Sequence, residues 1–198
     1  MDERKTKIIA FLREIDKFKF IIREIYRTDD KKETNSDHVW HIAMFLLLFE
    51  KDVAERVDIL KCFKMILIHD IVEMYAGDTF AFVDADAKKE KEVQEIKAAE
   101  KLFGQLPEDL GEEIHNLWKE YEAAETKEAR FVKGLDRLQA FNQNIISNGR
   151  IWWERNVTFD KAKDYKQEFI NSDELLTEVY NDMLEEVKKI FDDKNKQS

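Results

Sequence analysis

Apolar residues recur every three or four positions along most of this chain. Over residues 3–26 the spacing is continuous, and it is typical of a helix that buries one face. The polar segment 28–37 that follows predicts a loop. Beyond it the same helical spacing predicts further helices over about 36–50, 58–75, 88–103, 108–123, 127–149 and 159–191.

Glycine and proline mark several of the predicted helix ends. The third predicted helix is expected to stop at Ala76-Gly77, because glycine tolerates the left-handed conformation that ends helices. Gly104 and Pro107 separate the helices on either side of them. The segment 80–92 is expected to be a loop with a charged shoulder.

The composition predicts the fold class. Five glycines and one proline among 198 residues leave few helix breakers, while 43% of the residues are hydrophobic and 38% are charged. This balance favours long amphipathic helices over a turn-rich β fold. A chain of this length suits one domain with a substantial core. We therefore predict a single all-α bundle over residues 1–198, with about six to eight helices and a frayed tail at 192–198.

Charge and hydropathy exclude several classes of partner. The net charge is −10 without a long basic block, so binding to a nucleic-acid polymer is not expected. No stretch approaches the roughly 20 apolar residues of a membrane span, and the N-terminus lacks a signal-peptide core. The single cysteine, Cys62, lies in an apolar run and is expected to be a reduced core residue, which fits a cytoplasmic protein.

Ionisable residues interrupt an apolar run at 65–78, MILIHDIVEMYAGD. This stretch holds His69, Asp70, Glu73 and Asp78, although burying such groups without partners is costly. His69 and Glu73 are four positions apart and share a helix face, while Asp70 lies about 100° away from His69. A ligand at the helix end could contact all three. For this stretch alone, a histidine bonded to its neighbours near a helix end is the simpler interpretation.

Two other predicted helices carry further buried candidates. His38 and His41 lie where the pattern is otherwise apolar, and Asp136 is turned toward the core side of its helix. Two histidines and two aspartates from three helices form a nitrogen and oxygen site suited to Mn²⁺, Co²⁺, Fe²⁺, Ni²⁺ or Zn²⁺, whereas an all-oxygen site would suit Mg²⁺ or Ca²⁺ better. Spacing alone does not choose between His38 and His41. His115 lies among polar residues and is expected to be exposed or half-buried.

The order of His38, His69-Asp70 and Asp136 resembles the H…HD…D signature of HD-domain metal-dependent phosphohydrolases, an all-α family. The stretches SDHVWHIA, HDIVEMYAGD, LPEDL, LWKEYE and EARFVKGLDRLQA further resemble its small single-domain branch, which contains the bacterial 5′-deoxynucleotidases. The resemblance covers roughly residues 18–145. It implies that His38, His69, Asp70 and Asp136 bind one divalent metal ion.

The same resemblance assigns roles to residues beside the metal. Glu73 matches the catalytic glutamate in HDxxE. Asp78, which follows Gly77, matches an aspartate that helps to orient the substrate sugar. His41 is left as a core residue or as a support for a metal ligand.

The residues from Arg27 onward depart from the family pattern. The family places an arginine at the end of its first helix, usually followed by threonine or a similar residue and then by Gly-Trp. Here Arg27-Thr28 is followed by Asp29-Asp30. We predict that Arg27 contacts the substrate phosphate, the alternative being an exposed cation favoured by the helix dipole. Because the family's tryptophan packs near the sugar, its replacement predicts weaker sugar and positional selectivity.

The resemblance implies a phosphohydrolase that removes phosphate from (deoxy)nucleoside 5′-monophosphates. A bound divalent ion lowers the pKa of water, the resulting hydroxide attacks phosphorus, and Glu73 moves a proton. One alternative is an HD hydrolase of a nucleoside triphosphate, a cyclic nucleotide or a non-nucleotide monoester. Another is a non-catalytic helical module that keeps the metal as a staple. The resemblance and the four tryptophans also predict a homodimer.

Overall fold

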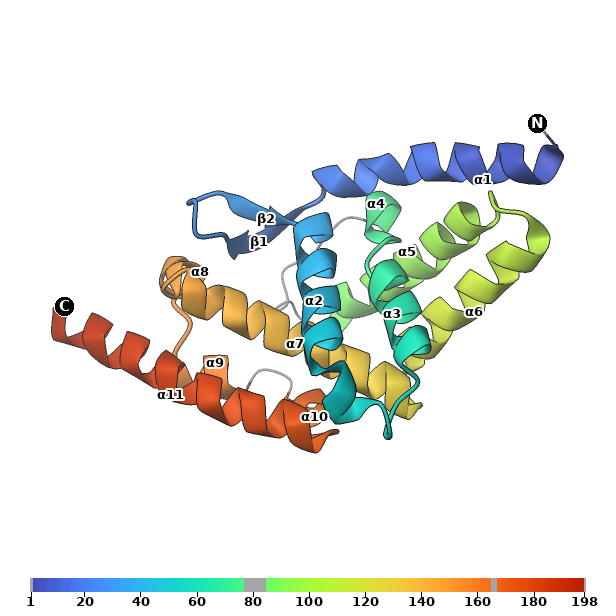
Figure 1. The fold of residues 1–198 in the computed structure, drawn as a ribbon. Helices are drawn as coiled ribbons and strands as arrows, with labels where there is room; N and C mark the ends of the chain where they lie inside the picture. Colours follow the sequence, from blue (N-terminus) through green and yellow to red (C-terminus); the bar gives the residue numbers. More distant parts are fainter. Residues whose placement is uncertain (1, 77–84, 165–166, 198) are drawn as a thin grey trace.

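The computed structural model describes residues 2–76, 85–164 and 167–197, and helices dominate it (Figure 1). The chain starts with α1 (Glu3–Glu14), the 3₁₀ helix η1 (Ile15–Phe20) and the strands β1 (Ile22–Tyr26) and β2 (Lys32–Thr34). The later helices are α2 (Asn35–Val53), α3 (Ile59–Ile68), α4 (Glu73–Ala76), α5 (Ala85–Phe103), α6 (Glu108–Ala123), α7 (Lys127–Ile146), α8 (Arg150–Glu154), α9 (Phe159–Asp164), α10 (Gln167–Ile170) and α11 (Glu174–Gln197). The all-α prediction is confirmed, with more helical segments than expected because several predicted helices are interrupted.

A two-stranded sheet replaces the end of the first predicted helix. β1 and β2 pair antiparallel, with Ile22 opposite Thr34 and Tyr26 opposite Lys32. The prediction of one helix over 3–26 is therefore wrong beyond η1. Apolar residues in this short stretch fit a helix and a strand equally well, and the pairing with β2 decides between them.

The third predicted helix is interrupted where the ionisable residues begin. α3 stops at Ile68, and α4 begins only at Glu73. Between them the chain makes tight turns, in which the Ile71 amide donates to the Ile68 carbonyl at 3.2 Å and the Glu73 amide to the Asp70 carbonyl at 3.0 Å. The expected continuous helix is wrong here, and the expected stop at Gly77 lies outside the described residues.

Further boundaries differ from the prediction. The helix expected over 159–191 is interrupted between α10 and α11, and α11 continues to Gln197 where a frayed tail was expected. α5 begins at Ala85, inside the segment predicted as a loop. Helices packed on a core can extend through charged residues, because their stability comes largely from the buried face.

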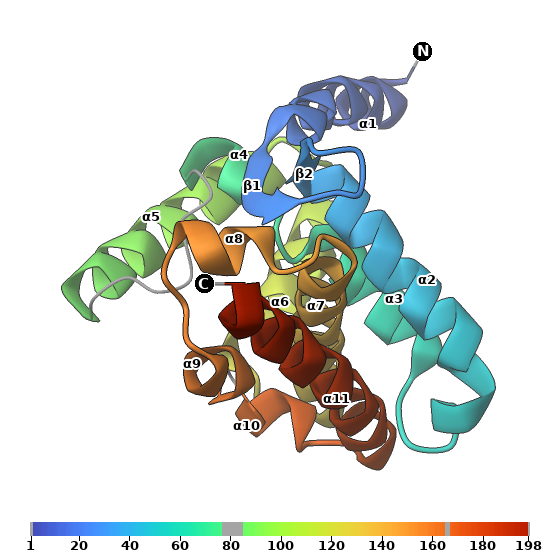
Figure 2. The same ribbon diagram turned by 90° about the vertical axis from the view of Figure 1, so that its left-hand side faces the viewer.

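α7 lies at the centre of the fold, between α11 on one side and α2 and α3 on the other (Figures 1 and 2). Its side chains Phe131, Leu135 and Leu138 are each about 1% exposed. Gly134 permits the close approach of the chain near α10, since an added Cβ would lie 2.8 Å from the Phe169 carbonyl oxygen. The middle of α7 is thus buried on several sides, and any polar group there needs partners.

Cys62 is a fully buried, unpaired cysteine in this core. Burial raises the pKa of its thiol to about 12, so the reactive thiolate is scarce at neutral pH. Its predicted place in the core is confirmed. Across the part of the chain that the structure describes, no helix is both long enough and apolar enough to cross a bilayer.

Candidate metal centre

Three elements bring the predicted metal ligands together. His38 lies in the first turn of α2, whose start is fixed by a capping box at Thr34. His69 and Asp70 lie in the turn that follows α3, and Asp136 lies in the middle of α7. The break after α3 therefore faces the start of α2 and the centre of α7.

The donor atoms of these side chains converge within the core. His38 Nε2 lies 3.1 Å from Asp136 Oδ1 and 3.8 Å from Asp70 Oδ2, and His69 Nε2 lies 3.3 Å from Asp70 Oδ2. Donor atoms of His38, His69 and Asp136 all lie within 4.8 Å of one another. Two imidazole nitrogens and carboxylate oxygens thus surround one small volume.

The histidine rings are held by their other nitrogen atoms. His38 Nδ1 donates to Gln139 Oε1 at 2.5 Å, and His69 Nδ1 donates to the Ile66 carbonyl oxygen at 2.8 Å. Both Nε2 atoms are buried and lack a hydrogen-bond partner among the described residues. Metal-binding histidines typically have this arrangement, in which one nitrogen is tied to an acceptor and the other faces the ion. The donor set fits a divalent metal ion.

Electrostatics keep the acids of this cluster ionised. Burial by itself would raise the pKa of Asp136, but the nearby Arg137 and His38 hold it well below its usual range. Burial opposes ionisation of Asp70 in the same way, and His69 and Arg23 lower its pKa. Burial would lower the pKa of His69, but Asp70 raises it to about 9. The buried carboxylates thus favour a positive charge at this position, which a bound cation would supply.

Glu73 and Asp78, the predicted catalytic pair, differ in what the structure describes of them. Glu73 opens α4, is 6% exposed and accepts a hydrogen bond from Asn35 Nδ2 at 2.7 Å. Since Asn35 is the first residue of α2 and His38 lies in the same first turn, this hydrogen bond ties the start of α4 to the helix start that carries His38. Asp78 and Gly77 lie outside the described residues.

Arg27 is engaged in the turn between the strands. It follows β1 and does not end a helix, so the helix-dipole alternative is wrong. Its Nε donates to Asp29 at 3.1 Å, and its Nη1 donates to Asp37 at 3.0 Å. Asp29 is correspondingly acidic, because Arg27 lowers its pKa to about 2.

A different arginine, Arg23, reaches the cluster. It lies on β1 with 17% of its side chain exposed, and its Nη1 donates to Asp70 Oδ2 at 3.2 Å. Its Nε lies 3.2 Å from Oε2 of the buried Glu33. Sequence reasoning missed both residues, because residues 15–26 were assigned to a helix and Glu33 to a polar loop. The available signal was an arginine that directly follows three apolar residues in FIIREIY.

The two remaining histidines do not join the cluster. His41 Nδ1 lies 3.3 Å from Gln139 Nε2, so it contacts a residue that holds His38. His115 is half-buried, as expected, and its ring lies beside those of Phe103 and Trp118.

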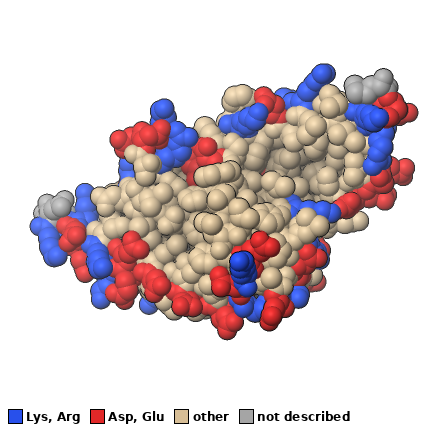
Figure 3. Space-filling view, viewed as in Figure 1, with Lys and Arg blue, Asp and Glu red and all other residues tan. Residues whose placement is uncertain are grey.

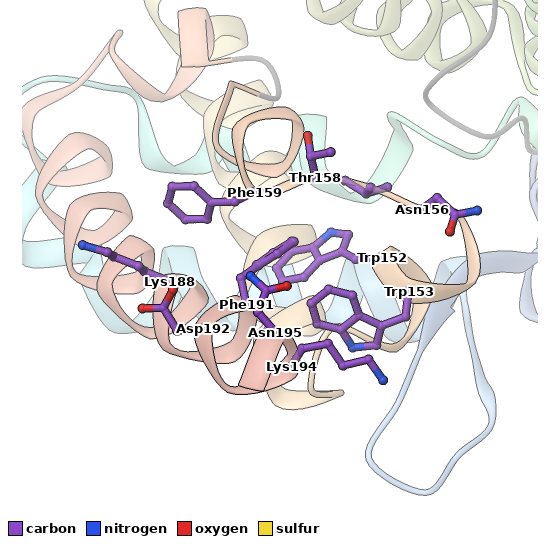
Figure 4. Close-up of a pocket in the computed structure, with 11 residues that line it drawn as sticks. Trp152, Trp153, Asn156, Thr158, Phe159, Lys188, Phe191, Asp192, Lys194 and Asn195 are labelled. Atoms are coloured by element: carbon purple, nitrogen blue, oxygen red, sulfur yellow. The ribbon is translucent and has the colours of Figure 1, made fainter. Parts of the chain in front are cut away.

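A separate hollow of about 590 Å³ lies between the α8–α9 region and the end of α11 (Figure 4). Its walls include Trp152, Trp153 and Phe159, with Lys188 and Lys194 at its edge. None of the cluster residues lines it. The convergent histidines and carboxylates are at the buried cluster and do not line this hollow.

A model of the HD domain family matches residues 15–177, most of the chain. The chain belongs to the HD domain family. Residues 1–14 and most of α11 lie beyond the match. The match extends past the 18–145 expected from the motifs, and it includes all three elements that carry the cluster.

Named relatives of this HD domain share one description. This chain is 35% identical to the 5′-deoxynucleotidase HDDC2 of Mus musculus over 138 residues. The matched region covers 69% of this chain and 67% of that protein. The HDDC2 of Homo sapiens is 34% identical, with 66% of its length covered. The 5′-deoxynucleotidase hdd1 of Schizosaccharomyces pombe is 30% identical over 170 residues, covering 83% of this chain and 80% of that protein. The chain thus spans about two-thirds of the HDDC2 relatives.

Solved structures show the same architecture. A crystal structure of a predicted metal-dependent phosphohydrolase from Magnetospirillum magnetotacticum is 38% identical, with a TM-score of 0.84 over 94% of both chains. The PH0347 protein of Pyrococcus horikoshii is 19% identical with a TM-score of 0.58, and that likeness shows the fold alone.

Proposed function

We propose that this HD domain is a metal-dependent phosphomonoesterase that removes phosphate from (deoxy)nucleoside 5′-monophosphates. The observation that carries the proposal is the convergence of two buried imidazole Nε2 atoms and two ionised carboxylates, with Glu73 and Arg23 close by. The 5′-deoxynucleotidase relatives support the substrate class. We further propose that residues 1–198 form one domain.

The metal ligands in this proposal are His38, His69, Asp70 and Asp136. Their nitrogen and oxygen donors favour Mn²⁺, Co²⁺, Fe²⁺, Ni²⁺ or Zn²⁺ over Mg²⁺. When bound, such an ion activates water for attack on phosphorus and withdraws charge from a phosphate oxygen. A phosphate dianion would otherwise be repelled by the carboxylates that line the site.

The chain's own residues then bind substrate and move protons. Arg23 neutralises the part of the phosphate's negative charge that the metal ion does not neutralise. Its guanidinium is in position to do so, because it already contacts the predicted ligand Asp70. Asn35 holds the carboxylate of Glu73 in place through a hydrogen bond. That carboxylate exchanges a proton with the attacking water or with the leaving oxygen. Asp78 orients the sugar, a role supported by the motif alone.

A substrate comparison tests this function. Purified protein with saturating Mn²⁺ or Co²⁺ is expected to hydrolyse dAMP, with kcat/KM measured beside AMP and deoxyadenosine 3′-monophosphate. Because Asp29-Asp30 replaces Gly-Trp, we expect a deoxy preference smaller than in tryptophan-bearing relatives, since packing against one group discriminates by only about 10–200-fold. Strong rejection of both comparison substrates would contradict the weakened selectivity. Inactivity on all three, with activity on another phosphate ester, would favour the alternative HD hydrolase.

The two arginines provide a matched test of phosphate binding. We expect Arg23→Ala to lower kcat/KM by about 10–100-fold, mainly through KM, because it removes a charge-assisted contact to phosphate. Arg27→Ala should change kcat/KM by less than about threefold, since Arg27 is paired with surface acids. Steady-state kinetics on dAMP with both variants measures this. A larger loss of kcat/KM in Arg27→Ala than in Arg23→Ala would indicate that Arg27 contacts the phosphate, as the motif predicts.

We also propose a homodimer in the cytoplasm. Five large apolar side chains on α2 and α3 are at least half exposed: Trp40, Leu47, Leu48, Leu60 and Leu67. Figure 3 shows a broad uncharged area in the middle of the molecule, where Figure 1 draws α2 and α3. Apolar patches on soluble proteins commonly mark interfaces. The buried, unpaired Cys62 fits a reducing compartment. Light scattering at micromolar concentration should give a dimer mass, and a monomer mass would reject the dimer.

A further inference from the structure

Gln139 uses every hydrogen-bonding group of its amide in the wall of the metal centre. It is fully buried on α7, one turn beyond Asp136. Its Oε1 accepts from His38 Nδ1 at 2.5 Å, and its Nε2 lies 2.9 Å from Glu33 Oε1 and 3.3 Å from His41 Nδ1. Both amide hydrogens and the amide oxygen therefore have partners.

Glu33 decides which way this amide faces. Its side chain is 2% exposed; its Oε1 accepts from Gln139 Nε2, and its Oε2 lies 3.2 Å from Arg23 Nε, so both oxygen atoms face nitrogen donors. If the amide were reversed, its oxygen would face the carboxylate and repulsion would replace the bond. The amide nitrogen must therefore face Glu33, which directs the oxygen of Gln139 toward His38.

The amide orientation in turn decides the tautomer of His38. An amide oxygen cannot donate, so His38 Nδ1 must carry the proton of the 2.5 Å bond. The lone pair of the neutral ring is then on Nε2, which lies 3.1 Å from Asp136 Oδ1. A ring with its proton on Nε2 would present a hydrogen atom to the metal position.

We propose that Glu33 and Gln139 are positioning residues that fix His38 as its Nδ1–H tautomer and so aim its Nε2 lone pair at the metal. This inference rests on the proposed metal site. The three side chains form one buried chain of hydrogen bonds. The carboxylate of Glu33 orients the amide of Gln139, and the amide oxygen orients the imidazole of His38. Partners of this kind commonly change metal affinity by about 10–100-fold.

Gln139→Leu is the cleanest variant, because Glu33 also lies beside Arg23 and its replacement would disturb two contacts. Leucine keeps most of the buried volume and removes the bond to His38. We expect its affinity for Zn²⁺, measured by chelator competition, to fall about 10–100-fold. The matched control is Gln143→Leu, one turn along α7, where a buried glutamine donates to the Tyr26 carbonyl and touches no predicted ligand. The control should keep wild-type affinity.

A rescue variant separates positioning from packing. In Glu33→Gln/Gln139→Glu the donor and acceptor are exchanged: the new carboxylate at 139 accepts from His38, and the new amide nitrogen at 33 donates to that carboxylate. The amide oxygen at 33 takes the place of Oε2 beside Arg23, so that contact is kept. This pair should bind Zn²⁺ within about threefold of wild type, because the His38 partner is restored. Failure of the swapped pair to bind better than Gln139→Leu would indicate that the native pair serves packing alone and would overturn the proposal.

Histidine NMR reads the tautomer directly and without enzymatic turnover. With only four histidines in the chain, ¹⁵N-labelled, Zn²⁺-loaded protein should show His38 with metal-bound Nε2 and a slowly exchanging Nδ1 proton. That proton should exchange rapidly in Gln139→Leu. A wild-type His38 without a proton on Nδ1 would overturn the proposal even if the variant failed to fold. If these signals are present but no phosphate ester is hydrolysed, the proposed function fails and this inference stands.

Discussion

Asp136→Asn is expected to abolish metal binding and to lower kcat/KM by at least about 10³-fold, since metal activation of water and phosphate contributes several kcal/mol. Asp136 is 5% exposed, and its Oδ1 lies 3.1 Å from His38 Nε2. The neighbouring Arg137 helps to keep its carboxylate charged inside the core. An amide in its place keeps the shape but brings no negative charge to the cation. Metal content by mass spectrometry and turnover of dAMP measure the two losses.

The control for Asp136→Asn is Asp173→Asn. The Asp173 side chain is 8% exposed and pairs with Arg56 at 2.8 Å, at the start of α11 and away from the cluster. Its amide variant removes a similarly buried, arginine-paired charge, yet it should retain metal and activity. Stoichiometric metal with unchanged affinity in Asp136→Asn would show that Asp136 is not a ligand.

The cluster could be predicted from the sequence because its ionisable residues lie in segments that are otherwise apolar. His38, His69 and Asp136 interrupt apolar helical patterns, and such residues need partners once they are buried. All three are indeed buried, and their donor atoms converge. Motif spacing then selected His38 over His41, a choice that periodicity could not make. Gln139 lies three positions after Asp136 on the same face of α7, and its partners come from β2 and α2, which the local sequence does not indicate.

The errors occur where tertiary contacts override local pattern. Strand β1 exists because residue 22 pairs with residue 34 across a turn, and no local signal in FKFIIREIY distinguishes that strand from a helix. Placing this segment in a helix hid Arg23, whereas Arg27 was predicted from the family motif and stays a prediction. A strand instead turns Arg23 toward Asp70 and Glu33.

The break after α3 was unpredictable for a different reason. MILIHDIVEMY is strongly apolar with good helical spacing, and it contains neither glycine nor proline. A continuous helix would separate His69 and Asp70 by about 100° around its axis. The observed turn instead brings His69 Nε2 within 3.3 Å of Asp70 Oδ2. Local preference thus yields to the geometry of the site, which is expected where function opposes regular structure.

Glu73→Gln should separate catalysis from metal binding, because the glutamine keeps the shape and the acceptor for Asn35 Nδ2 but cannot exchange a proton. We expect kcat to fall by about 10²–10⁴-fold, the usual contribution of a general acid or base, while metal content and KM stay close to wild type. Glu128→Gln is the matched control. Glu128 is 7% exposed and accepts from the Asp58 amide at 3.1 Å, so it is an equally buried, hydrogen-bonded glutamate on α7 without a predicted catalytic role. Turnover of dAMP with saturating Mn²⁺, beside metal analysis of each preparation, gives the comparison. A near-normal kcat in Glu73→Gln would remove Glu73 from the mechanism, whereas loss of metal in that variant would make it a ligand.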